Sequence, residues 1–213
     1  MISIIKESWF EFLAQLKPLI TATAPWILAA VALEAILSAL SDDINGFIFF
    51  LFLVVGSIPK AMIAFTGLQA LFRNKGVEIE VTSGKIITLI LASIYIGIAV
   101  IFGFLFFVLP SLIVMAASFF VPIYILKYGQ GPIEAVASSA SLLQGKILHV
   151  TLLLCCVWLA IYAVQFIIRF GCGVLPVPDI VTLVISTSVS LIVGLVTLPV
   201  MINLQAHLEV EHS

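Results

Sequence analysis

Two ionisable side chains, Glu34 and Lys60, lie deep within the long apolar runs of this sequence. A charge at the centre of a membrane helix costs about 2.5–3.5 kcal/mol on insertion scales, so we expect neither side chain to face lipid. Two interpretations stay open. The two residues form an ion pair that joins the first and second spans, or they form a polar site inside a cavity, with Lys60 meeting water at a break around Gly56, Ser57 and Pro59.

Gln165 and Arg169 are four positions apart near the outer end of the fifth predicted span. On a helix this spacing places both side chains on one face. Arg169 is expected either to extend to the headgroup region or to pair with Asp179 in the next turn. His149 has no second His, Cys or acid at ligand spacing, so no metal site is predicted.

Motifs for enzymatic chemistry are absent from the sequence. There is no GxSxG, no HExxH and no glycine-rich phosphate loop, the patterns that position a nucleophile, a metal-bound water or a phosphate. Ser138, Ser139 and Ser141 form a cluster, but no base stands at a fixed spacing from it. We therefore expect no catalytic residues and no cofactors. A membrane-embedded hydrolase with a reactive Ser139 is the enzymatic alternative.

The composition is that of a membrane protein. Of the 213 residues, 63% are hydrophobic and only 9% are charged, whereas about a quarter of the residues of a soluble domain are charged. This balance excludes intrinsic disorder, a nucleic-acid binder and a disulfide-stapled secreted domain. The expected fold class is an all-α integral membrane protein with about six transmembrane helices and additional amphipathic interfacial helices.

The apolar runs predict one bundle over residues 18–204, followed by a short polar tail over 205–213. A membrane span needs about 20 apolar residues. The expected spans are 18–40, 47–72, the two arms of 86–126, 146–170 and 180–204. We expect the two arms to separate at Leu109-Pro110-Ser111, because Pro110 removes a backbone donor; a break nearer Gly103 is the alternative.

Two segments have the spacing of amphipathic helices that lie in the membrane interface. The first is 1–17, in which Trp9 and Lys17 are expected to anchor the helix at the headgroup level. The second is 132–144, which follows the expected anchor Lys127 and is too short to span the membrane. We expect it to lie in the interface or to tuck inward against the bundle.

Basic residues gather on one side of this topology. They are Lys6, Lys17, Arg73, Lys75, Lys85, Lys127 and Lys146, whereas the opposite turns carry Asp42, Asp43 and Asp179. Because basic residues are enriched on the cytoplasmic side of membrane proteins, both termini are expected in the cytoplasm.

Short motifs in the middle of the chain resemble a known family. They are Leu109-Pro110-Ser111, Pro122 and Gly131-Pro132-Ile133-Glu134-Ala135, followed by Ser139, Ser141 and Gly145. Over about 86–170 this order resembles the YciC-like family of bacterial inner-membrane proteins, which is similar to the membrane domain of some glycerophosphodiester phosphodiesterases. The chain departs from the family pattern at Ser111, where the family favours Gly, and lacks the basic and Trp residues usual after Glu134.

That resemblance implies an all-helical six-span fold in the bacterial cytoplasmic (inner) membrane and a role in envelope or membrane homeostasis without known catalysis. The phosphodiesterase activity is not implied, since it belongs to a soluble domain.

The expected function is therefore that of a non-enzymatic, polytopic inner-membrane protein that acts in membrane homeostasis through lipid or protein partners. Its working surfaces would be the two interfacial helices and the polar loop 73–85. Membrane lipids are the expected partners, a homo-oligomer or a membrane-protein complex is left open, and nucleic acid is excluded. The alternative is a small transport component or channel with a polar site at Glu34 and Lys60.

Overall fold

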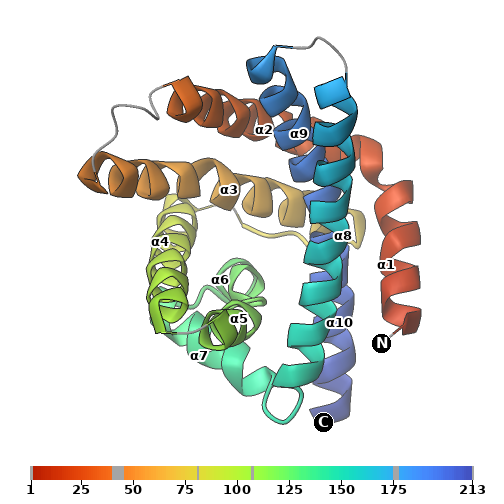
Figure 1. Cartoon of the computed structure of the whole chain (residues 1–213). Helices are drawn as coiled ribbons and strands as arrows, with labels where there is room; N and C mark the ends of the chain where they lie inside the picture. The colour runs from red at the N-terminus through yellow and green to blue at the C-terminus, as the bar shows by residue number, and fades with distance from the viewer. Residues whose placement is uncertain (1, 40–45, 81, 107, 175–177, 213) are drawn as a thin grey trace.

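The computed structural model describes residues 2–39, 46–80, 82–106, 108–174 and 178–212, and the regular structure in these ranges is helical throughout. The helices, in chain order, are α1 (Ile2–Ala14), α2 (Leu16–Ala39), α3 (Gly46–Asn74), α4 (Ser83–Phe106), α5 (Val108–Ala117), α6 (Val121–Tyr128), α7 (Pro132–Leu142), α8 (Ile147–Val174), α9 (Asp179–Gly194) and α10 (Thr197–His212). Figure 1 shows their arrangement.

The described helices contain six stretches long and apolar enough to cross a membrane. These are Leu16–Ala39, Val55–Asn74, Ser83–Gly103, Pro110–Tyr128, Ile147–Ile168 and Val181–Val210. This confirms the predicted all-α membrane fold. Two of the six stretches are pairs of shorter helices, because the fourth joins α5 to α6 and the sixth joins α9 to α10.

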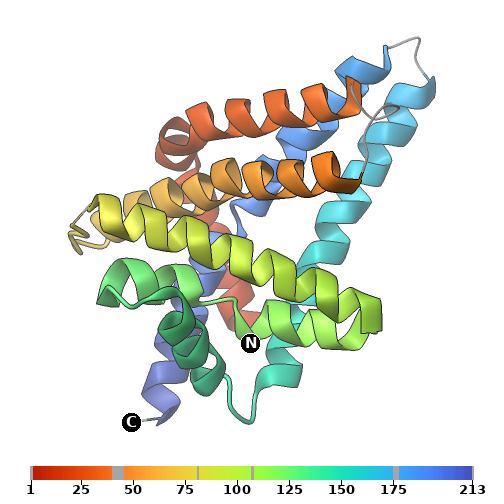
Figure 2. The ribbon, with the colours of Figure 1, turned by 90° about the vertical axis from the view of Figure 1, so that its left-hand side faces the viewer.

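Helices α2, α3 and α4 lie side by side in chain order, as Figure 2 shows. Helix α9 packs on both α2 and α8, and α8 also packs on α5. The predicted break in the second span is wrong, because α3 runs without interruption through Gly56, Ser57 and Pro59. A proline is tolerated inside a membrane helix when neighbouring groups satisfy the backbone carbonyl that it leaves free.

The apolar run 86–126 folds into the predicted hairpin, but its break is elsewhere. Helix α4 ends at Phe106 and α5 begins at Val108, so Pro110 lies in the first turn of α5. A proline is compatible with that turn because its missing N–H would have no partner there. A Cβ at Gly103 would lie 2.9 Å from the Ser111 Cα, so the glycine lets the two arms meet backbone to backbone.

A turn separates α5 from α6, and α7 packs beneath it. The N–H of Phe120 at this turn donates to Ser139 Oγ of α7 at 3.1 Å, and both residues are fully buried. The end of α6 is held to the start of α4, because Lys85 Nζ donates to the Leu126 carbonyl at 3.1 Å. The second arm is thus tied to α7 at the turn in its middle and to α4 near its end.

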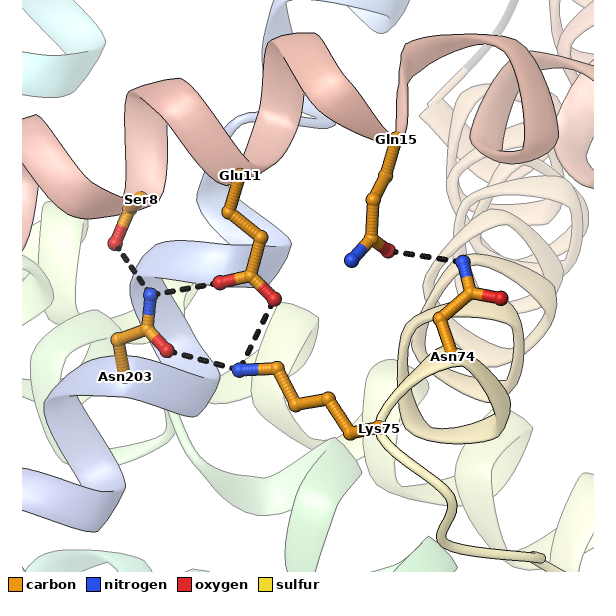
Figure 3. A network of polar contacts seen from close by, with 6 residues as sticks. All are labelled: Ser8, Glu11, Gln15, Asn74, Lys75 and Asn203. Carbon is orange, nitrogen blue, oxygen red and sulfur yellow. Dashed lines mark hydrogen bonds and ion pairs between the residues drawn. The ribbon is translucent and has the colours of Figure 1, made fainter.

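A polar junction joins both ends of the chain to the loop after α3 (Figure 3). Lys75 Nζ lies 3.0 Å from Glu11 Oε1 of α1 and donates to Asn203 Oδ1 of α10 at 3.0 Å. The Asn203 amide donates in turn to Glu11 Oε2 at 2.9 Å and to Ser8 Oγ at 3.1 Å. These bonds satisfy the polar groups that α1 turns toward α10.

Helix α10 continues through 205–212, the segment expected to be a polar tail. Gln205 and Leu208 are buried there. Glu209 accepts hydrogen bonds from Gln205 Nε2 at 2.7 Å and from the Tyr128 hydroxyl of α6 at 3.2 Å. The polar residues therefore make one bond within α10 and one to α6, and hydropathy alone does not indicate either.

Candidate functional site

Each of the segments expected to be working surfaces has one part packed in the fold and another part exposed, such as Trp9, Phe10 and Ile133. Helix α1 packs on α10 and buries Ile4, Ser8 and Phe12. Helix α7 buries Ala135 and Ser139. The polar loop after α3 is held at Lys75 by the junction described above. A further candidate for a functional site is a cavity between the helices of the bundle.

A cavity of about 610 Å³ lies between α2, α3, α4, α5 and α8. Its wall is mostly apolar and includes Leu33, Ile94, Ile101 and Met115. Glu34 from α2 and Lys60 from α3 both line it, so the structure brings the two intramembrane charges of the sequence to one cavity. The lining helices can be followed in Figure 1.

Glu34 has a different partner from the one that the sequence suggested. Its Oε2 accepts a hydrogen bond from Thr187 Oγ1 of α9 at 2.7 Å. Within the part of the chain that the structure describes, no ion pair joins Glu34 to Lys60. A hydroxyl bonded to a carboxylate partly replaces the solvation that the carboxylate loses. Glu34 thus joins α2 to α9 and keeps one edge in the cavity.

Lys60 lies near the middle of α3, with a side chain that the protein leaves exposed. It lines the large cavity and also a second cavity of about 400 Å³ between α3, α8, α9 and α10. Trp158 of α8 lines both cavities as well. The two spaces therefore adjoin at the Lys60 and Trp158 side chains.

Gln165 lines the second cavity, together with the small residues of α9 and the start of α10. The spacing of Ser186, Ser190, Gly194 and Thr197 is typical of a small-residue face on which membrane helices pack closely. Only part of that stripe is packed: Ser186 is buried, whereas a Cβ at Gly194 would meet no atom within 4 Å. Ser190, Gly194 and Thr197 line the cavity instead.

Trp9, Lys17 and Lys127 line neither cavity. Trp9 is 48% exposed on α1, and Lys17 is exposed at the start of α2. Lys127 is exposed at the end of α6, with Nζ 4.9 Å from the centre of the Tyr128 ring. These positions are compatible with interfacial anchors. Arg169 belongs to α8, but its side chain lies outside the described part of the structure.

The serine cluster has a structural use. Ser139 is fully buried and its Oγ accepts the Phe120 N–H, while Ser141 Oγ donates to the Ser138 carbonyl at 2.9 Å. Among the described residues, no group of three His, Cys, Asp or Glu side chains is placed to hold a metal ion.

Sequence reasoning missed Thr187, Trp158 and Gly97 as parts of the site. Gly97 of α4 lines the large cavity, and a Cβ there would meet no atom within 4 Å. Two of the three had a signal: a glycine inside an apolar helix usually has a packing or functional reason, and Trp prefers the interface to mid-span. Thr187 had none, because its bond to Glu34 spans 153 positions.

No protein-family model, no curated protein and no solved structure matches this chain. The resemblance to the YciC-like family therefore stays a prediction, and functional inference depends on the geometry of the site.

Proposed function

We propose that this chain is a non-enzymatic membrane protein that binds a membrane amphiphile in the cavity between α2, α3, α4, α5 and α8. The observation that carries the proposal is an apolar cavity of about 610 Å³ with Glu34 and Lys60 in its wall. Binding sites for small molecules have volumes of about 300–1,000 Å³ and a few polar groups in an apolar lining. A lipid or fatty acid combines an apolar chain with a polar end in the same way.

The cost of an empty cavity supports the proposal. Protein interiors are close-packed, and a void forfeits contacts between the atoms that line it. The cavity is open toward the exterior of the bundle, so a lipid chain from the surrounding membrane can enter it. A bound acyl chain would restore these contacts, so occupancy stabilises the bundle.

The engagement of Ser139 supports the non-enzymatic part of the proposal. A serine nucleophile needs an adjacent base and access to substrate, whereas Ser139 is buried and accepts a backbone hydrogen bond. Failure of an active-site serine probe to label the folded protein would agree with this; labelling that Ser139→Ala removes would contradict it.

We further propose that the chain lies in a bacterial inner membrane with both termini in the cytoplasm. Contacts that join Lys75 to α1 and α10, and Lys85 to the end of α6, support a common side for these segments. Single cysteines at positions 42 and 78, in a background without the native cysteines, test this. A membrane-impermeant thiol reagent applied to intact cells is expected to label position 42 alone. Equal labelling of both positions would overturn the proposed topology.

Amphiphile binding is tested by a substitution that fills the cavity and leaves the side chains of its wall unchanged. Gly97→Leu places a side chain into open space, and Gly171→Leu is the matched control, because Gly171 is helical, equally open and lines neither cavity. Protein purified in mild detergent is extracted and its retained lipids are quantified by mass spectrometry.

We expect wild type and Gly171→Leu to retain an amphiphile in near-stoichiometric amount, and Gly97→Leu to retain about tenfold less, which corresponds to 1.4 kcal/mol. Wild-type protein without a retained amphiphile, or equal retention by the Gly97→Leu variant, would overturn the proposal.

A transport component is the second candidate function. The observation in its favour is that two cavities adjoin at Lys60 and Trp158, since a path across a membrane protein is a chain of such spaces. Under this candidate, the double variant Glu34→Gln with Lys60→Gln loses flux in reconstituted vesicles. Wild-type flux by a stably folded double variant would reject it.

A further inference from the structure

The second cavity differs from the first in its polar groups. Of the described residues that line it, Lys60 is the charged one, and Gln165, Ser190 and Tyr162 supply neutral donors. Glu34 does not line this cavity. The second cavity is therefore an electropositive space, whereas the large cavity contains a carboxylate as well as the lysine.

The Lys60 ammonium has no ion pair within the part of the chain that the structure describes. It lies near the middle of α3, about four turns from Arg73, the next charged residue of that helix. A cation at membrane depth is stabilised by a partner or by water in a cavity. The nearby carboxylate of Glu34 is bonded to Thr187, so an anion from outside the chain is a suitable partner for Lys60.

We infer that the second cavity binds the anionic headgroup of the amphiphile, with Lys60 as the residue that contacts it, while the apolar chain passes Trp158 into the large cavity. This inference rests on the proposed function and names the ligand class: an acyl chain that ends in a carboxylate or a phosphate. The amide of Gln165 and the hydroxyl of Ser190 donate to the same headgroup. Charge-assisted hydrogen bonds of this kind are stronger than neutral ones.

Open space at Gly194 belongs to the same site. A Cβ there would meet no atom within 4 Å, so the turn between α9 and α10 leaves room where a close-packed bundle would not. A side chain at Gly194 would fill the headgroup space, just as one at Gly97 would fill the chain space. Substitutions at Gly194 and Gly97 therefore test the headgroup site and the chain site separately.

The test uses Trp158 as a reporter. The sequence has three tryptophans, and Trp9→Phe with Trp26→Phe leaves Trp158 alone at the contact between the cavities. The full-length variant is placed in nanodiscs of neutral lipid. It is titrated with three amphiphiles whose hydrocarbon chains carry bromine at the same carbons. They are a fatty acid, the corresponding fatty alcohol and a phosphatidylglycerol, and bromine quenches tryptophan on contact.

We expect saturable quenching by at least one anionic chain and a dissociation constant at least about tenfold weaker for the alcohol. Quenching by the fatty acid identifies a free carboxylate as the headgroup, and quenching by phosphatidylglycerol identifies a phosphate. Lys60→Gln and Gly194→Leu are expected to weaken the anionic chain about tenfold and to leave the alcohol unchanged. Lys6→Gln, an exposed residue of α1, is the control and leaves both unchanged.

Two failures are distinguishable. Saturable quenching that is equal for acid, phospholipid and alcohol, and unchanged in Lys60→Gln, overturns the headgroup assignment and leaves amphiphile binding intact. Quenching that never saturates for any chain overturns the proposed function itself.

Discussion

Gly97 and Gly103 lie six positions apart on α4 and meet opposite surroundings. A Cβ at Gly103 would be 2.9 Å from the Ser111 Cα, whereas a Cβ at Gly97 would meet no atom within 4 Å. One glycine lets two backbones touch, and the other borders a cavity of about 610 Å³. The same residue type on one helix therefore marks a close-packed region and a hollow one.

The close-packed region comprises α6, α7 and the contact between the end of α4 and the start of α5 at Gly103 and Ser111. The hollow region is bounded by α2, α3, α8, α9, the start of α10 and the faces of α4 and α5 that line the large cavity. Hydrogen bonds tie the first region together where the helices break, as at Phe120 and Ser139. In the second region, polar groups such as Lys60 line empty space. This difference suggests that the first region holds the fold and that the second is kept open for a ligand.

The largest effect is expected for Gly103→Leu. The new side chain collides with the backbone of α5, which has no alternative rotamer, so we expect a loss of about 3 kcal/mol of unfolding free energy, the upper end of the overpacking range. Thermal unfolding in detergent, followed by circular dichroism, measures it. A melting temperature equal to that of wild type would show that the hairpin is not close-packed at this point.

Ser139→Ala tests the close-packed region by a different route. It leaves the buried Phe120 N–H without its acceptor, which is expected to cost about 1–3 kcal/mol. The neighbouring variant Ser138→Ala is the control, because the Ser138 side chain makes no hydrogen bond to any described residue. Equal stability of the two variants would show that the bond to Phe120 contributes nothing.

Hydropathy and charge were sufficient to predict the six spans, because each span is a local property of about 20 residues. The helix breaks were harder. Pro59 and Pro110 have the same local signature, yet one lies inside a continuous helix and the other in a first turn. The packing of neighbouring helices decides between these outcomes, and this packing cannot be predicted from a single sequence.

The sequence was sufficient to predict the charged residues of the candidate site but not the cavities around them. Glu34 and Lys60 stand out because ionisable residues are rare in membrane spans. The hydrogen bond from Thr187 to Glu34 joins residues 153 positions apart, and the open space at Gly194 looks like a packing stripe in sequence. Contacts and voids of this kind arise only when helices are assembled.

Gly97→Leu tests whether the hollow region is open in the folded protein. Leucine is a better helix former than glycine by about 0.5–1 kcal/mol, and the cavity accepts the added atoms. In delipidated protein we expect stability to rise by about that amount. A destabilisation comparable to that of Gly103→Leu would mean that the cavity is closed in solution.

The smallest effect is expected at the polar junction. The Lys75 and Glu11 side chains are 35% and 17% exposed, and ion pairs this accessible contribute about 0.2–1 kcal/mol. A double-mutant cycle of Glu11→Gln and Lys75→Met measures the coupling, which added salt should reduce. A coupling that persists unchanged at high salt would argue against an ionic contact.

The central claim is that the hollow region of this bundle holds an amphiphile. A density map of the full-length protein, purified in mild detergent without added lipid, tests it most directly. We expect elongated density between α2, α3, α4 and α8, with its polar end against Lys60. A map in which side chains close both cavities, or in which they are empty, would contradict the claim.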